Sequence, residues 1–331
     1  LEDDNRLSSV RERMSEAYRK AMRAMGLFAA VASLLCGVKM ENIKAKKCFG
    51  QNFLHDEATL NKIIQAIPKD TRNIVEIGPG LGDLTFRILR ICGVTSYEID
   101  TELFVLLQKK FANEIQNGRL KLFCKDALDQ WSESGLNDEP YFLAANLPYY
   151  VATKMILNAV EDERCRGMVV MIQKEVALKF SAKSGDRDFS SLAILASCCA
   201  CSLAASRRAW RSCFSFNRAC WSCFNPPPKV TSSVIKLQKS KNLIDETGVF
   251  KSKFEYEKFK TYLKIAFSAP RKTLMKNLSS SYNKPEIERI FSMLNLSANI
   301  RPHELNVDLY LEVFKNLKED NERQKRRKSG S

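Results

Sequence analysis

The four residues Asn146-Leu-Pro-Tyr149 could hold a flat aromatic amine in place for reaction. The side-chain oxygen of Asn146 and the carbonyl of Leu147 can accept the two N–H bonds of an exocyclic amino group, which favours a more tetrahedral nitrogen with its lone pair free. Pro148 restricts the backbone so that both acceptors converge. The ring of Tyr149 offers a face on which a base can stack. Catalysis at such a site would be mainly orientation.

A glycine-rich loop and two carboxylates could hold the second reactant. Gly78, Gly80 and Gly82 follow an apolar run and let the backbone approach a ligand closely. Glu98 comes 20 residues after Gly78, at the end of the next apolar run, where a carboxylate can accept both hydroxyls of a ribose. Asp126 follows a third run and could accept from an adenine amino group. The predicted ligand contains adenosine: either a nicotinamide dinucleotide or S-adenosylmethionine.

The Asn146–Tyr149 motif decides between these two ligands. It is of the Asp/Asn/Ser-Pro-Pro-Tyr type found in methyltransferases that act on amino groups, which favours S-adenosylmethionine as the cofactor. Each acidic residue taken singly could equally be a helix cap, and the motif could be an ordinary turn. Their occurrence in this order, each at the end of an apolar run, favours a binding site.

These residues all follow predicted strands. Strands are expected at Asn73–Ile77, Val94–Ile99, Leu120–Cys124, Tyr141–Ala145 and Gly167–Ile172, with amphipathic helices such as Asp83–Ile91 and Leu103–Phe111 between them. Strands that alternate with helices predict a doubly wound parallel sheet, whose carboxyl edge would gather the candidate residues. The predicted fold class is α/β, with a Rossmann-like methyltransferase domain at 44–240.

A small all-α domain is predicted at 241–318, followed by a basic tail at 319–331. Its expected helices are Phe254–Ser268, Lys284–Leu294 and Val307–Leu317. Residues 1–43 form an extension that we expect not to belong to the native fold, with a natural start near Met40. The apolar stretch within it, Ala24–Val38, is too short to span a bilayer.

The composition predicts a globular protein with a polyanionic partner. Hydrophobic residues make up 45% of the chain, which excludes a disordered or fibrous protein. Lys and Arg number 53 against 38 Asp and Glu, a net charge of +15, which predicts a nucleic acid first and an anionic membrane second as partner, and the charge alone does not choose between them. The basic residues expected to contact RNA phosphates are Lys44, Lys46 and Lys47 before the glycine loop, and Arg271 and Lys272 at the start of a helix in the small domain.

The segment 198–223 is atypical because it holds six of the eleven cysteines. Cys198-Cys-Ala-Cys201 and Cys220-Trp-Ser-Cys223 have the spacing of a zinc ribbon. The segment lacks the glycines of such turns, however, and its Ser, Arg, Cys and Trp content resembles translation in a wrong frame. We favour that interpretation over a zinc site or a genuine insertion. His55 and His303 are isolated, so no metal site is expected elsewhere.

The chain resembles the bacterial small-subunit rRNA adenine dimethyltransferase family over about residues 44–317. The motifs that carry the resemblance are Phe49-Gly-Gln-Asn-Phe-Leu54, Val75-Glu-Ile-Gly-Pro-Gly-Leu-Gly82, Tyr97-Glu-Ile-Asp100, Asp126-Ala127, Asn146-Leu-Pro-Tyr-Tyr150, Phe189-Ser-Ser-Leu192, Phe224-Asn-Pro-Pro-Pro-Lys-Val230 and Arg271-Lys-Thr-Leu274. This family binds S-adenosylmethionine and transfers two methyl groups to each of two adjacent adenines in a hairpin near the 3′ end of small-subunit rRNA. The resemblance implies a cytoplasmic monomer that acts on pre-30S particles and has no membrane partner.

The resemblance also implies roles for single residues. Asn52 and Leu54 would close over the cofactor, Glu98 would hold its ribose and Phe189 would stack on the target base opposite Tyr149. The full expected cofactor set is Asn52, Leu54, Gly78, Gly80, Glu98, Asp126 and Asn146, and the full catalytic set is Asn146, Leu147, Pro148, Tyr149 and Phe189. Taken without the family, Gln51–Leu54 is a polar loop before a helix, and Phe189 is an ordinary core residue.

Two alternatives remain open at this point. One is the related large-subunit rRNA methyltransferase that confers macrolide resistance, although Leu147 and the run Pro226-Pro-Pro-Lys229 favour the small-subunit type. The other is a non-catalytic RNA-binding or transcription factor built on the same fold. The intact Asn146–Tyr149 motif argues against this second alternative.

Overall fold

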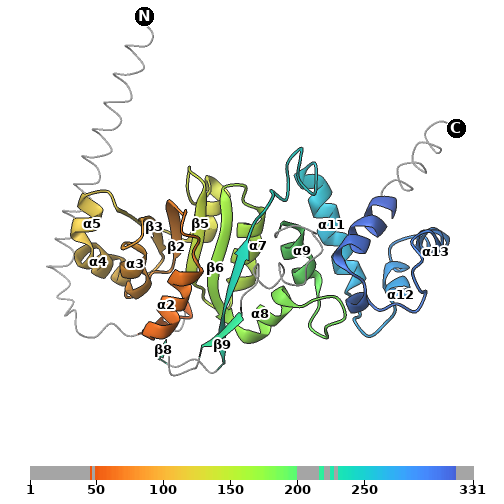
Figure 1. Ribbon diagram of the computed structural model, residues 1–331, viewed down its shortest axis with the longest axis horizontal. Helices are drawn as coiled ribbons and strands as arrows, with labels where there is room; N and C mark the ends of the chain where they lie inside the picture. The colour runs from red at the N-terminus through yellow and green to blue at the C-terminus, as the bar shows by residue number, and fades with distance from the viewer. Residues whose placement is uncertain (1–44, 47–48, 200–215, 220–223, 227–229, 318–331) are drawn as a thin grey trace, which may run out of the picture.

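The computed structural model describes residues 45–46, 49–199, 216–219, 224–226 and 230–317, and for 216–219 only the backbone. A seven-stranded sheet with helices on both faces forms one part of the molecule, and a group of helices follows at one end (Figure 1). The expectations for 1–43, for the basic tail and for Lys44 and Lys47 fall outside the described residues. So do those for Cys201, Cys220 and Cys223, which stay predictions.

The sheet has the strand order β4-β3-β2-β5-β6-β9-β7. Its strands are β2 (Asn73–Ile77), β3 (Gly93–Glu98), β4 (Leu120–Cys124), β5 (Tyr141–Asn146), β6 (Cys165–Gln173), β7 (Phe216–Ala219) and β9 (Ser232–Gln238). In chain order, β3 and β4 are added on one side of β2, and β5 and β6 are then added on its other side. Ligands of doubly wound sheets bind at such a reversal, beyond the carboxyl ends of the strands, which here is between β2 and β5.

The five predicted strands are present with nearly the predicted bounds, but the sheet is mixed rather than wholly parallel. β2 to β6 pair in parallel, whereas β9 runs antiparallel to both β6 and β7. Parallel neighbours need a long crossover between them, while antiparallel strands can follow one another directly. The chain between β7 and β9 contributes the short strand β8 (Phe224–Asn225), which pairs antiparallel with β1 (Phe53–Leu54).

Both faces of the sheet are covered, which explains why the inner strand β5 is apolar at successive positions rather than at alternate ones. On β5, Phe142 and Ala144 belong to one core cluster, and Leu143 and Ala145 belong to the other. The first cluster is closed by α2 (Glu57–Ala66), α3 (Asp83–Ile88) and α4 (Thr101–Lys110), after which comes α5 (Ala112–Gln116). The second is closed by α6 (Ala127–Glu133), α7 (Ala152–Glu161), α8 (Lys174–Ser181) and α9 (Ser191–Cys199).

The helical part consists of α11 (Lys253–Ala266), α12 (Leu274–Leu278), α13 (Lys284–Met293), the short 3-10 helix η3 (Pro302–Glu304) and a helix at 307–317. Its three long helices match the predicted ones, and α12 begins three residues after the helix start that was expected at Arg271. Aromatic rings fill its interior: Tyr262 lies 5.5 Å from Phe314 and 6.2 Å from Tyr310 between ring centroids. The same core cluster includes Leu143 of β5, so the helical part and one face of the sheet share a core.

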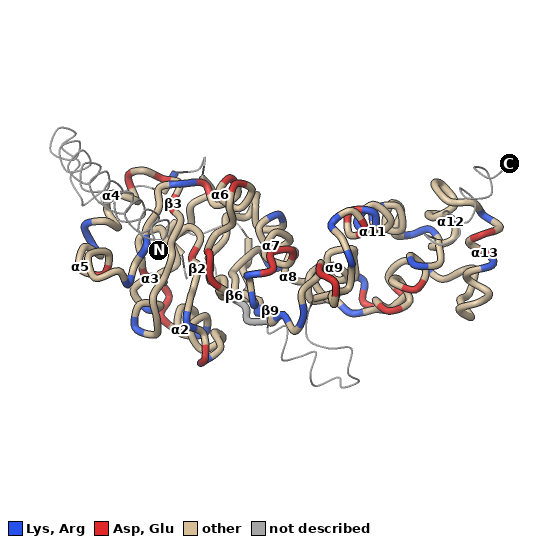
Figure 2. The backbone as a smooth tube through the Cα atoms, turned by 90° about the horizontal axis from the view of Figure 1, so that it is seen from above, with Lys and Arg blue, Asp and Glu red and all other residues tan. Residues whose placement is uncertain are grey.

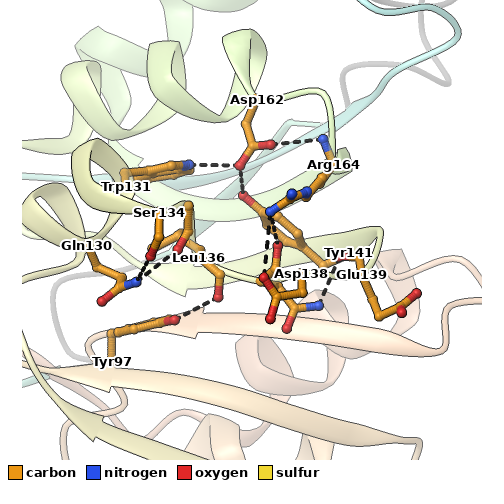
Figure 3. Close-up of polar contacts among 12 residues, drawn as sticks. Tyr97, Gln130, Trp131, Ser134, Leu136, Asp138, Glu139, Tyr141, Asp162 and Arg164 are labelled. Atoms are coloured by element: carbon orange, nitrogen blue, oxygen red, sulfur yellow. Dashed lines mark hydrogen bonds and ion pairs between the residues drawn. The ribbon is translucent and has the colours of Figure 1, made fainter. Parts of the chain in front are cut away.

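A polar network fixes the amino end of β5 (Figure 3). Asp162 accepts hydrogen bonds from the Trp131 indole at 2.9 Å, the Tyr141 hydroxyl at 2.6 Å and the Arg164 amide at 2.8 Å. Burial raises the pKa of Tyr141, so this hydroxyl stays protonated and donates a hydrogen bond to the carboxylate. The network joins α6 and β5 to the turn before β6. It lies at the start of β5, whereas Asn146 ends that strand.

Three cysteines of the described chain, Cys165, Cys198 and Cys199, are buried in the core, while Cys124 is exposed. Cys124 is exposed because it ends the edge strand β4. Within the described ranges, no group of three or more His, Cys, Asp or Glu residues is placed to hold a metal ion. None of the helices in the described part of the chain has the length and apolar character needed to cross a bilayer.

Candidate active site

A cavity of about 1170 Å³, counting the space open to solvent at its mouth, lies beyond the carboxyl ends of β2, β3 and β5. Three loops form its walls: the glycine loop after β2, the turn after β3 and the Asn146–Tyr149 turn after β5. The segment Phe49–Leu54, which precedes α2, forms a further wall. Its size suits a nucleoside-sized ligand with space for a second group.

The glycine loop leaves open space within this cavity. Gly78 has φ +66°, a left-handed conformation that favours glycine, and a Cβ placed there would meet no atom within 4 Å. Any side chain at this position would therefore project into the cavity rather than against protein. The amide of Gly80 donates a hydrogen bond to Glu98 Oε2 at 3.1 Å, which fixes the loop to the end of β3.

The two carboxylates predicted to bind the adenosine both line the cavity. Glu98 is only 3% exposed, and burial raises its pKa although backbone amides of Asp100 and Gly80 counteract this. Asp126 caps α6, because its Oδ1 accepts the amide of Leu128 at 2.8 Å. Asp126 is thus a helix cap, as its sequence position alone allowed, and its side chain also lines the cavity.

Glu76 is a cavity residue that the sequence reasoning missed. It is 1% exposed, and its Oε2 accepts hydrogen bonds from Thr85 at 2.7 Å and Ser96 at 2.9 Å. Its Oε1 is buried and has no hydrogen-bond partner among the described residues. Burial, with a smaller contribution from Glu98, raises the pKa of Glu76 to about 7. The available signal was an acidic residue inside the otherwise apolar run Asn73–Ile77.

Hydrogen bonds to the rest of the protein fix Asn146, Leu147 and Tyr149 in the turn that lines the cavity. Asn146 Nδ2 donates to the carbonyl of Asn52 at 2.9 Å, which leaves Oδ1 as the free end of the amide. The amide of Leu147 donates to Met171 on β6 at 3.0 Å, and no hydrogen bond from the described residues reaches the Leu147 carbonyl. The Tyr149 hydroxyl is 2.7 Å from Ser232 Oγ on β9, which anchors the ring.

The structure brings together all but one of the predicted cofactor and catalytic residues. Asn52, Leu54, Gly78, Gly80, Glu98, Asp126, Asn146, Leu147, Pro148 and Tyr149 all line the cavity. Phe189 does not: it is 5% exposed and packs against Phe267 of the helical part, with 6.3 Å between ring centroids. The prediction that Phe189 stacks on the target base is therefore not matched by its position. Its motif sits in the turn before α9, on the core side of the sheet.

Three of the residues predicted to contact RNA, Lys46, Arg271 and Lys272, lie in the described part of the chain. The ammonium of Lys46 forms ion pairs with Asp100 and Glu102, each at 2.9 Å, so it is directed to the protein and not outward. Arg271 and Lys272 are exposed, and no ion pair in the described part of the chain involves them. They lie in the turn before α12, which begins at Leu274, rather than at the start of a helix.

Comparison with known proteins identifies the family. The model of the family described as ribosomal RNA adenine dimethylase matches residues 42–319. The chain belongs to this family. The ribosomal RNA small subunit methyltransferase A of Campylobacter curvus is 70% identical over 289 residues, which cover 87% of this chain and 98% of that protein. The protein of the same name from Campylobacter fetus subsp. fetus is 49% identical over 291 residues, 87% of this chain and all of that protein.

Two solved structures resemble this adenine dimethylase in fold. A dimethyladenosine transferase from Plasmodium falciparum has a TM-score of 0.60 at 22% identity, covering 79% of this chain and 95% of its own. The 23S rRNA methyltransferase ErmE has a TM-score of 0.58 at 20% identity, covering 81% and 100%. At these identities the likeness shows the fold alone, which is the predicted Rossmann-like methyltransferase sheet followed by a helical part.

The methyl donor of the dimethylase family is S-adenosylmethionine, and the cavity fits this cofactor. The empty space above Gly78 can take the part of a ligand that passes closest to the backbone. The unpartnered Oε1 of Glu76 is a buried acceptor that a positively charged or N–H-bearing group of a ligand would satisfy. Glu98 and Asp126 supply carboxylates at the ends of the next two strands, where a ribose and an adenine can be bound.

Proposed function

We propose that this dimethylase acts on small-subunit rRNA, where it converts the exocyclic amines of two adjacent adenines in the 3′-terminal hairpin to dimethylamines. The names of the relatives at 70% and 49% identity support the choice of subunit. The observation that carries the proposal is the position of Asn146 and Leu147, which open into the same cavity as Gly78 and Glu98. An amine held by the first pair would meet a methyl donor held by the second.

The turn after β5 would prepare the amine for attack. The lone pair of an adenine amine is delocalised into the ring, which makes it a poor nucleophile. Asn146 Oδ1 and the Leu147 carbonyl can each accept one of its N–H bonds, and both are free to do so, since Asn146 binds Asn52 through Nδ2 only. This arrangement favours a tetrahedral nitrogen whose lone pair points to the methyl donor. Positioning of this kind supplies most of the expected rate enhancement.

When bound, S-adenosylmethionine supplies an electrophilic methyl group. The groups proposed to hold it are the backbone of Gly78 and Gly80 and the carboxylates of Glu98 and Asp126, with Asn52 and Leu54 closing the cavity. The site has no need of a strong general base, because the amine becomes acidic only once it is methylated. After the first transfer one N–H remains, so one acceptor is sufficient for the second.

The target base would stack on Tyr149, and the edge of the base that carries the amino group would face the Asn146 amide. The hydrogen bond between Tyr149 and Ser232 holds this ring in a fixed position before the RNA binds. Such prior fixing reduces the entropy lost on binding. We propose no residue for the second face of the stacked base, since Phe189 lies in the core.

The RNA backbone would be bound by exposed basic residues. Figure 2 shows Lys and Arg positions on both the sheet and the helical part, interspersed with Asp and Glu. Arg271 and Lys272 are the described candidates for phosphate contacts, and we keep Lys44 and Lys47 as candidates from the sequence alone. We propose that the protein acts as a monomer on pre-30S particles in the cytoplasm, where this substrate is assembled.

The substrate proposal is tested with two RNAs. Purified protein and labelled S-adenosylmethionine are incubated with assembly-stage small subunits or with naked large-subunit rRNA, and methylated adenines are located by mass spectrometry. We expect dimethylation of two adjacent adenines in the 3′ hairpin of the small subunits only. Methylation of the large-subunit RNA alone would show that the protein is of the macrolide-resistance type instead.

The role of Asn146 is tested by Asn146→Ala. We expect methyl transfer to fall by at least about 100-fold, because the amine loses an acceptor that acts in the transition state. RNA binding, measured by filter retention, should stay within about twofold, because phosphate contacts supply most of the affinity for RNA and Asn146 is assigned to the target base. Dimethylation at the wild-type rate would overturn the catalytic assignment. Methyl transfer by the wild-type protein in the same assay tests the alternative of a non-catalytic RNA-binding factor, which would bind the RNA without methylating it.

A further inference from the structure

Asp100 connects the end of β3 to the chain segment that forms the outer wall of the cavity. Its side chain is 1% exposed. Oδ1 accepts from Lys46 Nζ at 2.9 Å and from the amide of Glu102 at 3.0 Å, and Oδ2 accepts from Gln51 Nε2 at 2.8 Å. Lys46 and Gln51 also contact one another, since Gln51 Oε1 accepts the amide of Lys46 at 2.7 Å. One buried carboxylate thus binds two side chains from the far side of the site.

The backbone of Asp100 extends this connection to the residues expected to hold the cofactor. Its amide donates to Glu98 Oε1 at 3.0 Å, and the other oxygen of Glu98 accepts the amide of Gly80. A continuous chain of hydrogen bonds therefore runs from Gln51 through Asp100 and Glu98 to the glycine loop. Movement of Asp100 would change both walls of the cavity.

The segment held by Asp100 also determines which end of the Asn146 amide faces the cavity. Asn52 follows Gln51 directly, and its carbonyl accepts Asn146 Nδ2 at 2.9 Å. An amide has one donor end and one acceptor end, so this bond leaves Oδ1 for the substrate. Without the Asn52 carbonyl, the Asn146 amide could flip and present its N–H bonds to the target amine. The target amine is itself a hydrogen-bond donor and needs an acceptor at that position.

The pKa shifts of Asp100 and Lys46 agree with a structural role for Lys46 as the partner of Asp100. Burial disfavours the charged form of Asp100, but the hydrogen bonds from Lys46 and Gln51 outweigh burial, and the pKa of Asp100 lies below its usual value. The pKa of Lys46 is raised, chiefly by its hydrogen bond to Asp100. A buried carboxylate that loses its cation is strongly unfavourable. Lys46 therefore stabilises the buried carboxylate of Asp100, although 31% of its own side chain is exposed.

We propose that Asp100 is a positioning residue for methyl transfer. Through Lys46 and Gln51 it fixes the segment Phe49–Leu54 against the cavity, and through the Asn52 carbonyl it sets the orientation of the Asn146 amide. The activity readout rests on the proposed function, but the cofactor readout does not. A purely structural alternative exists, because Asp100 also caps α4 by accepting the amide of Glu102.

The variant Asp100→Asn separates these two roles. Asparagine caps a helix about as well as aspartate and has the same size, so α4 and the fold should be kept. It lacks the charge for Lys46 and can accept at one oxygen only. We expect the KM for S-adenosylmethionine to rise about 10-fold and kcat to fall by a similar factor, since a charge-assisted hydrogen bond and the Asn146 orientation are both weakened. Activity lost only in proportion to the unfolded fraction would overturn the proposal.

Two lysine variants test whether Lys46 acts through Asp100 or through RNA. Lys46→Met should weaken binding of S-adenosylhomocysteine, measured by calorimetry without RNA, by about 10-fold, while Lys46→Arg should recover most of it. Glu102→Gln is the matched control: it removes only the exposed partner of Lys46 and should change this affinity by less than about twofold. An RNA affinity that falls with Lys46→Met while cofactor affinity is unchanged would overturn the positioning role.

These measurements distinguish failure of this proposal from failure of the proposed function. Calorimetry with S-adenosylhomocysteine reports on the cavity whichever RNA is methylated. If the wild-type protein bound this ligand but methylated no small-subunit RNA, the substrate would be wrong and the role of Asp100 could still be measured. If small-subunit RNA were methylated and Asp100→Asn changed neither KM nor kcat, only the positioning role would be wrong.

Discussion

At the scale of single residues, the type and spacing of a side chain predicted where it lies but not what it binds. Glu98, Asp126 and Asn146 follow their strands and reach the cavity, as their spacing indicated. Lys46 was expected to contact RNA because it is basic and precedes the site, yet its ammonium is held by Asp100, 54 positions further along the chain. Phe189 was assigned from a motif and is a core residue. Partners this distant in sequence depend on the fold, which local patterns do not encode.

Glu76 leads to a prediction about pH. Its pKa in the folded protein is raised by burial to about 7, against an ordinary value of 4.5. For an acid with a raised pKa, the protonated folded state is the favoured one, so its stabilising contribution is complete below pH 4.5 and is lost as the pH rises through 7. Glu76→Gln stays neutral at all pH values. Relative to the wild type, it should therefore gain stability between pH 4.5 and 7, by up to about 3 kcal/mol.

Urea unfolding of the cofactor-free proteins at pH 5 and pH 8 measures this difference. The wild type should lose more stability than Glu76→Gln between these two pH values. Glu57→Gln is a suitable control, because Glu57 is an exposed residue at the start of α2. A stability difference between wild type and Glu76→Gln that is the same at both pH values would mean that Glu76 does not titrate in this range.

At the scale of elements, the alternation of apolar runs predicted the five parallel strands almost to the residue. What it did not predict is the direction of β9. The run Ser232–Gln238 is mostly buried like its neighbours, but burial does not encode the direction of a strand, so its antiparallel pairing with β6 could not be predicted from the run itself. The short helix α12 was expected to begin at Arg271 but begins at Leu274, because five residues are too few to define its bounds by a helical period.

The network around Asp162 predicts how much one element depends on a single buried acceptor. Asp162→Ala would leave the Trp131 indole and the Tyr141 hydroxyl without this acceptor, and we expect a loss of about 2–4 kcal/mol in the free energy of unfolding. Asp138→Ala removes only an exposed partner of Arg164 and should cost less than about 0.5 kcal/mol. Chemical denaturation measures both. Methylation per folded molecule should be unchanged, because the network is at the opposite end of β5 from Asn146.

At the scale of the whole molecule, the change in pattern near residue 240 predicted a small all-α domain at 241–318 after the methyltransferase domain. The structure instead shows one core cluster that extends from Leu143 of β5 to Phe259 of α11. An ion pair between Lys260 and Glu161 joins α11 to α7 at 3.2 Å, and the amide of Ser240 donates to the Cys199 carbonyl at the end of α9. A sequence pattern shows which residues are buried, but it does not show which buried surfaces meet.

A shared core predicts that both parts unfold together. Phe259 is fully buried among Phe250, Tyr262 and Phe314, and Phe259→Ala should cost about 3–5 kcal/mol. If the core is one cooperative unit, native-state hydrogen exchange should show this loss in the amides of β5 and β6 as well as in those of α11. Phe254→Ala is the matched control: Phe254 is on the same helix but 70% exposed, and its replacement should leave exchange in the sheet unchanged. Loss of protection confined to α11, α12 and α13 would mean that the helical part is a separate folding unit and that the catalytic sheet is stable without it.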